Sequence, residues 1–186
     1  MGTVMDAKLA ALLDKQEILE ALSRFSRGMD RLDRELYLSA YHADGEMAAG
    51  PFVGLASECA DWAFPMHEEG QILTHHALLN TTIDLDGDTA HTETYYLFVA
   101  RNKDESLVQA GGRYINRFER RPEDGQGGEW KIALQTNVIE WAGLLPAIPI
   151  PFSDVPDLYG NGAPARDRTD PSYRRPLTNL RERMIP

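Results

Sequence analysis

The stretch that decides the fold is QILTHHALLNTTIDLDGDTAHTETYYLFVAR, residues 71–101. Its two flanks, Gln71–Leu85 and His91–Arg101, are rich in β-branched and aromatic residues, which favour strands. Between them, Asp86-Gly87-Asp88 is typical of a tight turn. Two further segments of the same character follow at 107–121 and 129–141, after turn-forming residues at 102–105 and 122–128. Four long strands in succession predict an antiparallel meander.

The residues before the meander have the spacing of helices. Between residues 5 and 28, apolar side chains recur every three or four positions with charges between them, which predicts one or two amphipathic helices. A second helix is expected at Arg31–Tyr41 and a third at Ala56–Glu68. A turn at His42–Gly45 and a short strand at Glu46–Ala49 are expected between them. Helices followed by a meander predict an α+β fold, with helices covering one face of the sheet.

Length and composition indicate one domain with an extension. The chain has 186 residues, 42% hydrophobic and 26% charged, which is typical of a single globular domain. After Trp141, prolines recur every few residues and exclude a regular helix. We therefore predict a folded domain at 1–142 and a proline-rich C-terminal extension at 143–186. The apolar stretch Leu144–Phe152 is expected to pack on the domain or on a neighbouring subunit.

The charge and the cysteine content exclude several classes of protein. A net charge of −10 provides no basic surface for nucleic acid or for an anionic membrane. No apolar run reaches the roughly 20 residues that a membrane span needs. The single cysteine, Cys59, excludes an intramolecular disulfide, and the N-terminus lacks the pattern of a secretory signal, so a cytoplasmic location is expected. The common zinc signatures are missing, so no metal is expected.

The adjacent histidines in the first strand are candidates for chemistry. Alternate side chains of a strand share a face, so His76 and Asn80 point one way while His75 points the other. An imidazole in an apolar cavity is a good general base, because its ordinary pKa lies near neutrality. A carboxylate should meet its other nitrogen, and Asp30 and Asp33, at the junction of two helices, both qualify. A half-buried strand histidine and a helix-capping aspartate are the plainer alternative.

Five motifs in order resemble a known family: FSRGMDRLD at 25–33, YHADG at 41–45, HALLN at 76–80, GRYINRFERR at 112–121 and GEWKI at 128–132. Together they cover about residues 6–142 and closely resemble the SnoaL-like branch of the nuclear-transport-factor-2-like superfamily. That resemblance implies a cystatin-like α+β fold, in which a curved sheet wraps around helices to form a cone with a deep pocket. Members include dehydratases, a dehydrochlorinase, isomerases and dioxygenase β subunits, so the fold does not settle the function.

Carried over by position, the family's acid-base pair falls on Asp30 and His76, and Asn80 keeps the family's spacing after the histidine. Two positions depart from the enzymes of the family. Phe25 stands where a bile-acid dehydratase would have a pocket tyrosine, and Gln135 stands where several relatives have an arginine. The resemblance therefore implies the catalytic pair, with different groups around it.

The remaining expectations concern the pocket wall and the other aromatic residues. The residues expected to contact the substrate are Phe25, Tyr37, Asn80, Tyr95, Tyr114, Gln135 and Asn137. Tyr95 and Tyr114 are expected to serve as core or wall residues rather than as proton donors. Trp62, Trp130 and Trp141 are expected in the core, while His42, His67 and His91 are expected to be solvated.

The function that these observations favour is that of a cofactor-independent lyase. His76 would remove a proton from an acidic carbon of a small hydrophobic, aromatic or polycyclic substrate, and Asp30 would orient the imidazole. Retro-aldol cleavage or isomerisation by the same pair is one alternative. A non-catalytic module, either a ligand binder or a β-subunit-like assembly partner, is the other. The resemblance also implies a homo-oligomer, with a trimer favoured and a dimer as the alternative.

Overall fold

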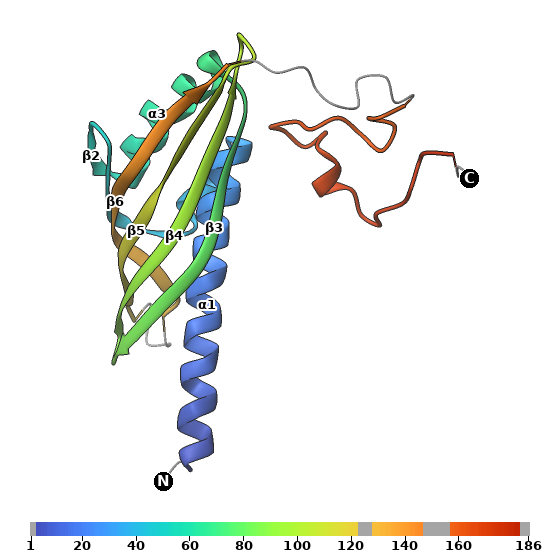
Figure 1. The fold of residues 1–186 in the computed structure, drawn as a ribbon. Helices are drawn as coiled ribbons and strands as arrows, with labels where there is room; N and C mark the ends of the chain where they lie inside the picture. Colours follow the sequence, from blue (N-terminus) through green and yellow to red (C-terminus); the bar gives the residue numbers. More distant parts are fainter. Residues whose placement is uncertain (1–2, 123–127, 147–156, 183–186) are drawn as a thin grey trace.

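The computed structural model describes residues 3–122, 128–146 and 157–182. The chain begins with one long helix, α1 (Val4–Arg31), whose first turn is capped by reciprocal hydrogen bonds between Thr3 and Asp6. The helix runs along one side of a curved sheet, and its N-terminal part projects beyond the sheet (Figure 1). The helical spacing predicted for residues 5–28 is therefore one uninterrupted helix.

The helix expected at Arg31–Tyr41 is present but much shorter than predicted. Leu32 has a left-handed backbone (φ 53°) that ends α1, and Asp33 caps a new helix, α2 (Arg34–Leu38), of only five residues. The turn expected at His42–Gly45 is wrong, because strand β1 (Tyr41–Ala49) already includes these residues. The parallel pairing of β1 with β6 shifts register between Tyr41 and Glu46. Turn-forming residues suit such an irregularity within a strand, which is why the segment resembles a turn in sequence.

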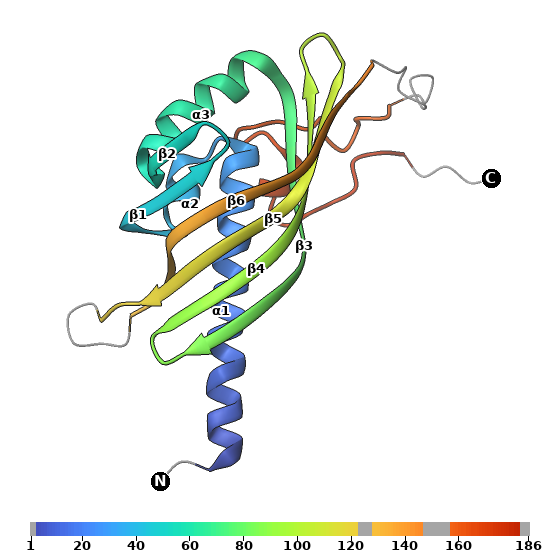
Figure 2. The same cartoon turned by 60° about the vertical axis from the view of Figure 1, so that its left-hand side comes forward.

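The sheet has six strands in the order β2-β1-β6-β5-β4-β3. The predicted meander is confirmed, since β3 (Gln71–Asp86), β4 (Thr89–Asn102), β5 (Leu107–Arg120) and β6 (Trp130–Leu145) pair antiparallel in succession. β1 pairs parallel with β6, and the short β2 (Phe52–Leu55) pairs antiparallel with β1. The sheet is therefore mixed and open, with β2 and β3 as its edges (Figure 2).

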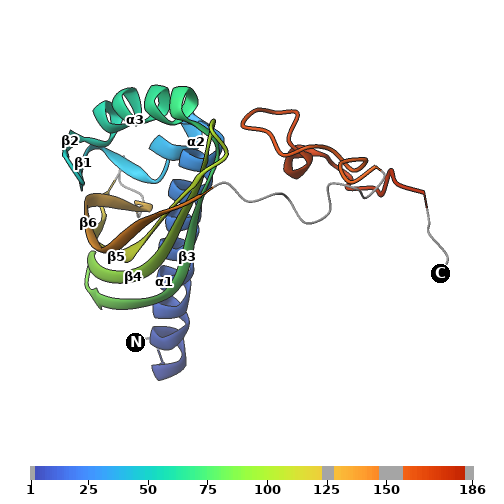
Figure 3. The same ribbon diagram turned by 45° about the horizontal axis from the view of Figure 1, so that its top comes forward.

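Helices α1 and α3 (Ala56–Gly70) pack against the sheet, which curves around them (Figure 3). The core between them is aromatic: Phe25 packs edge-on against Tyr114 at 5.3 Å between ring centroids, and Tyr37 lies 5.2 Å from Tyr41. Of the three tryptophans, Trp130 is fully buried as expected. Trp62 and Trp141 are half exposed, so their expected place in the core is wrong. The α+β class is confirmed.

Beyond the sheet, residues 157–182 form irregular structure with one short 3-10 helix, η1 (Pro171–Tyr173). The apolar stretch Leu144–Phe152 lies partly outside the described residues, and the division of the chain at 142 stays a prediction. Among the described helices, none is long and apolar enough to cross a membrane.

Candidate active site

Asp30 and His76 meet at the end of α1. His76 Nδ1 lies 2.6 Å from Asp30 Oδ1, and the backbone N–H of His76 donates to Asp30 Oδ2 at 2.9 Å. Both side chains are almost buried, with exposed fractions of 12% for Asp30 and 10% for His76. One carboxylate thus holds both the backbone and the ring of the histidine, although 46 positions separate the two residues.

Asp33, the other candidate, does not reach the histidine. Its Oδ1 accepts from the backbone N–H of Leu36 at 3.0 Å, which is the N-cap hydrogen bond of α2. The plainer reading therefore applies to Asp33, and the geometry selects Asp30 as the partner of His76.

The surroundings of His76 fix its ring. Phe98 packs on it at 4.7 Å between ring centroids, Phe25 lies at 6.3 Å, and Ser26 Oγ donates to the backbone carbonyl of His76 at 2.6 Å. Because Asp30 accepts from Nδ1–H, the ring nitrogen left to act as a base is Nε2. No described residue hydrogen-bonds Nε2.

Electrostatics keep Asp30 ionised. Burial raises the pKa of Asp30, but the hydrogen bonds and the charge interaction with His76 outweigh burial and leave that pKa below its ordinary value. An ionised Asp30 stabilises an imidazolium on His76, which is the state that a general base passes through.

A second histidine, which the sequence reasoning placed in solvent, belongs to this cluster. His67 is only 8% exposed, its ring lies 6.2 Å from that of His76, and its Nδ1 is 2.6 Å from Gln71 Oε1. Burial lowers its pKa, so the ring is neutral at pH 7. The signal was in the sequence, because Ala56, Ala60 and Ala63 precede His67 at helical spacing on the buried face of α3.

Most of the residues expected to line the pocket are buried in the core instead. Phe25, Tyr37, Tyr114 and Gln135 have almost no exposed surface. Gln135 Oε1 accepts from the Tyr41 hydroxyl at 2.7 Å, so this amide is engaged within the core. Burial raises the pKa of Tyr37 and of Tyr114, which argues against either as an ionised group. Their contact with a substrate stays a prediction, as does that of the half-buried Asn137.

The expected faces of Asn80 and Tyr95 are wrong. A register shift between Leu78 and Thr81 in the pairing of β3 with β4 breaks the alternation, so that Leu79 and Asn80 are both exposed. Tyr95 is 41% exposed. The neighbouring residues Thr94 and Tyr96 are the ones that β4 buries. Nothing in the structure brings Asn80 or Tyr95 to the acid-base pair.

One cavity is lined by Asp30, and a larger one lies nearby. Asp30 lines the smaller one, about 340 Å³, which lies beside α1 together with Ser26 and Arg27. The larger one, about 810 Å³, lies where the end of α3, the start of β3 and the extension meet. Neither Asp30 nor His76 lines the larger cavity, so a deep pocket around the pair stays a prediction.

One hydrogen bond and one ring contact link the larger cavity to the pair. Gln71 lines this cavity and bonds to His67, whose ring faces His76. Leu32, Phe64 and Leu73 supply apolar wall. Within the described ranges, no group of three or more His, Cys, Asp or Glu side chains could hold a metal ion.

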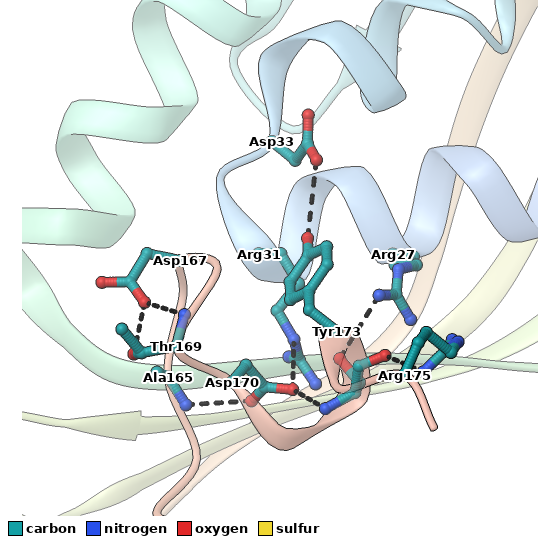
Figure 4. Close-up of polar contacts among 10 residues, drawn as sticks. Arg27, Arg31, Asp33, Ala165, Asp167, Thr169, Asp170, Tyr173 and Arg175 are labelled. Carbon is teal, nitrogen blue, oxygen red and sulfur yellow. Dashed lines mark hydrogen bonds and ion pairs between the residues drawn. The ribbon is translucent and has the colours of Figure 1, made fainter. Parts of the chain in front are cut away.

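The extension docks on the C-terminal end of α1, against Arg27 and Arg31 (Figure 4). Arg27 and Arg31, on either side of Asp30 in the sequence, contact the extension. Arg27 Nη2 donates to Ser172 Oγ at 3.3 Å, and Arg31 Nε lies 3.7 Å from Asp170 Oδ1. The Tyr173 hydroxyl donates to Asp33 at 3.5 Å. The extension therefore forms one border of the candidate site.

Comparison with solved structures shows where this fold occurs. A hexachlorocyclohexane dehydrochlorinase (LinA) type 2 superposes with a TM-score of 0.64 at 19% identity, covering 77% of this chain and 96% of that one. A provisionally named scytalone dehydratase from Novosphingobium aromaticivorans DSM 12444 gives 0.61 at 16% identity, covering 79% and 99%. A protein with a cystatin-like fold from Nostoc punctiforme PCC 73102 gives 0.51 at 22% identity, covering 74% and 95%.

At these identities the likeness shows the fold. A search of curated protein sequences found no match. The SnoaL-like domain family matches residues 10–135, which is more than half of the chain and includes Asp30 and His76. This match establishes that the chain belongs to the SnoaL-like domain family.

Proposed function

We propose that this protein is a cofactor-independent lyase in which His76 is the general base and Asp30 orients and charges it. The observation that carries the proposal is the 2.6 Å contact between Asp30 Oδ1 and His76 Nδ1 in a nearly buried environment. A purely structural subunit has no need of a carboxylate that holds an imidazole with one nitrogen left unbonded.

The proposed step is a β-elimination. Nε2 of His76 takes a proton from a carbon made acidic by a neighbouring carbonyl or aromatic ring. The electron pair of the broken C–H bond forms a C=C bond, and a leaving group departs from the adjacent carbon with the electrons of its own bond. The simplest leaving group is hydroxide, which takes up the proton and leaves as water. Asp30 stabilises the imidazolium formed on the way.

Two observations support the lyase class and the kind of substrate. Proteins named as a dehydratase and as dehydrochlorinases share this fold, and both names describe eliminations. The apolar residues Leu32, Phe64 and Leu73 on the larger cavity suit a hydrophobic, aromatic or polycyclic substrate.

The experiment is a screen of β-hydroxy ketones and hydroaromatic alcohols for loss of water, followed by variants of the pair with the best substrate. His76→Ala and Asp30→Asn should each lower kcat by about a hundred- to ten-thousand-fold, which is the usual worth of a general base. His75→Ala is the matched control, because this neighbouring side chain is exposed on the other face of β3.

The controls decide between the classes of function. Circular dichroism should show that all three variants stay folded. Near-normal turnover in His76→Ala or Asp30→Asn would contradict the proposal. If no compound in the screen reacts and the chain acquires activity only with a second protein, the non-catalytic assembly module is the better description.

A further inference from the structure

Arg166, in the extension, contacts the folded domain next to His67 and His76. Its Nη1 donates to the backbone carbonyl of His67 at 2.7 Å and to that of Gln71 at 3.2 Å, at the junction of α3 with β3. The guanidinium is thus anchored beside His67, whose ring faces His76 at 6.2 Å.

Anchoring uses only one end of the guanidinium. Nε and Nη2 of Arg166 are buried, and neither has an acceptor among the described residues. These two nitrogens lie on the same edge of the planar group, and their N–H bonds form the fork that matches the two oxygens of a carboxylate. A buried cation with an open fork is costly unless an anionic oxygen completes it.

The charges near Arg166 do not close that fork. Burial lowers the pKa of Arg166, while Asp30 and Glu68 act on it only through longer-range charge interactions that raise it. No ion pair within 4.0 Å joins Arg166 to a described acid. Capping of backbone carbonyls at the C-terminus of α3 explains only the hydrogen bonds of Nη1, and a lysine ammonium would make the same hydrogen bonds.

Arg166 also lines a cavity of suitable size and character. Arg166 lines the cavity of about 810 Å³, together with the apolar side chains of Leu32, Phe64 and Leu73. Cavities of this size hold drug-sized ligands, and a few polar groups on an apolar wall orient them. An aromatic or polycyclic acid combines the apolar body and the anionic end that such a cavity selects.

We infer that Arg166 is the specificity-determining residue of the larger cavity, and that its guanidinium, turned so that the unpartnered Nε and Nη2 face the cavity, binds the carboxylate of an aromatic or polycyclic acid. This inference rests on the proposed function in that it names the class of substrate that the cavity next to the acid-base pair would hold. It concerns binding rather than turnover, so it can fail or hold by itself.

The test compares two probes of equal shape, 2-naphthoate and 2-naphthamide, by isothermal titration calorimetry on the full chain. Wild-type protein should bind the carboxylate about tenfold or more tightly than the amide, as charge-assisted hydrogen bonds predict. Arg166→Gln should weaken naphthoate binding by about ten- to a hundredfold and change naphthamide binding by less than about twofold. Arg166→Lys, which keeps the charge without the fork, should fall between wild type and Arg166→Gln.

Two control variants make the result specific. Arg168→Gln removes a nearby arginine of the extension whose guanidinium lies over the Tyr173 ring, and it should leave both affinities unchanged. His76→Ala should lower kcat by about a hundred- to ten-thousand-fold and retain the preference for naphthoate. If His76→Ala loses turnover but Arg166→Gln binds naphthoate as wild type does, this inference alone is wrong. If Arg166→Gln loses naphthoate binding but His76→Ala keeps its turnover, the proposed function alone is wrong.

Three results would overturn the inference: equal affinity of wild-type protein for the two probes, an unchanged preference in Arg166→Gln, or no saturable binding of naphthoate at millimolar concentration. Thermal unfolding of each variant, followed by circular dichroism, separates a lost contact from a lost fold.

Discussion

At the scale of single residues, Asp30 does two tasks with its two oxygens. Oδ2 accepts from the backbone N–H of His76 and Oδ1 from its ring. The same side chain therefore fixes where β3 lies against α1 and which nitrogen of the imidazole carries the proton. An asparagine in its place keeps an acceptor for one of these N–H groups and loses the negative charge that stabilises the imidazolium.

Asp170 holds the extension together at the point where the extension meets Arg31 of α1. It is only 5% exposed, and its carboxylate accepts from the backbone N–H groups of Ala165 at 3.0 Å and Ser172 at 2.9 Å. Burial raises the pKa of Asp170, but these N–H donors and the charge of Arg31 outweigh burial and lower it to about 2.

Asp170→Asn should lower the free energy of unfolding by about 1 to 2 kcal/mol at pH 7, because a carboxylate with a depressed pKa stabilises the folded state wherever it is ionised. That contribution is complete above the unfolded value of 3.8 and is lost as the pH falls towards 2. Urea unfolding of both proteins at pH 7, 4 and 3 measures the difference, which should shrink with acid.

Asp167→Asn is the control for this prediction, since Asp167 is exposed and accepts only from the neighbouring Thr169. A difference between wild type and Asp170→Asn that stays constant from pH 7 to pH 3 would contradict the expected role of the ionised carboxylate.

The choice between Asp30 and Asp33 shows the limit of sequence reasoning at this scale. Both residues lie at the same helix junction, and the outcome depends on the left-handed backbone of Leu32, at which α1 ends. A leucine in that conformation has no signature in the sequence, because side chains other than glycine and asparagine rarely adopt it. Family resemblance, rather than spacing, selected Asp30 correctly as the partner of His76.

At the scale of elements, Gly28 is explained by packing. A glycine in this place was compatible with the end of a helix, but α1 continues through it to Arg31. A Cβ on Gly28 would lie 2.4 Å from the backbone nitrogen of Tyr37, so the glycine lets α2 approach α1 closely.

Gly28→Ala should therefore destabilise the protein by about 1 to 3 kcal/mol through overpacking, even though alanine is the better helix former. Gly70→Ala is the matched control, because a Cβ there would meet nothing within 4 Å. Urea unfolding of the two variants measures the effect. Equal stability of Gly28→Ala and Gly70→Ala would show that α2 can move away without cost.

The strands were more predictable than the helices. Long runs of β-branched and aromatic residues with turn chemistry between them predicted four strands at nearly the observed positions, because each hairpin is encoded locally. The bulge after Leu78 was not predicted, since which strand bulges depends on pairing with β4. For the same reason, the side of β3 on which Asn80 lies was predicted incorrectly.

At the scale of the whole molecule, the N-terminal part of α1 projects beyond the sheet (Figure 1). Its apolar side chains Leu9, Leu12 and Leu13 are more than half exposed, and Ile139, Trp141 and Leu144 on β6 are also exposed. Exposed apolar surface of this kind is typical of contacts between subunits. It favours the predicted homo-oligomer.

We expect light scattering after size exclusion to give a trimer, about three times the chain mass of 20.8 kDa, with a dimer as the alternative. Leu12→Lys should shift the protein towards the monomer, since it places a charge in an apolar contact. Lys15→Ala changes an exposed polar position of the same helix and should have no effect. A monomeric wild-type protein at micromolar concentration would contradict the expectation.

The docked extension has a consequence for how this protein could acquire new substrates. Proton transfer is assigned to α1 and β3, whereas one wall of the larger cavity comes from residues 159–167, far along the chain. Exchange of that terminal piece between relatives would alter what is recognised while the proton-transfer chemistry is inherited intact. Selectivity and reactivity are then separable traits, which a chimera library limited to the last thirty or so codons could vary one at a time.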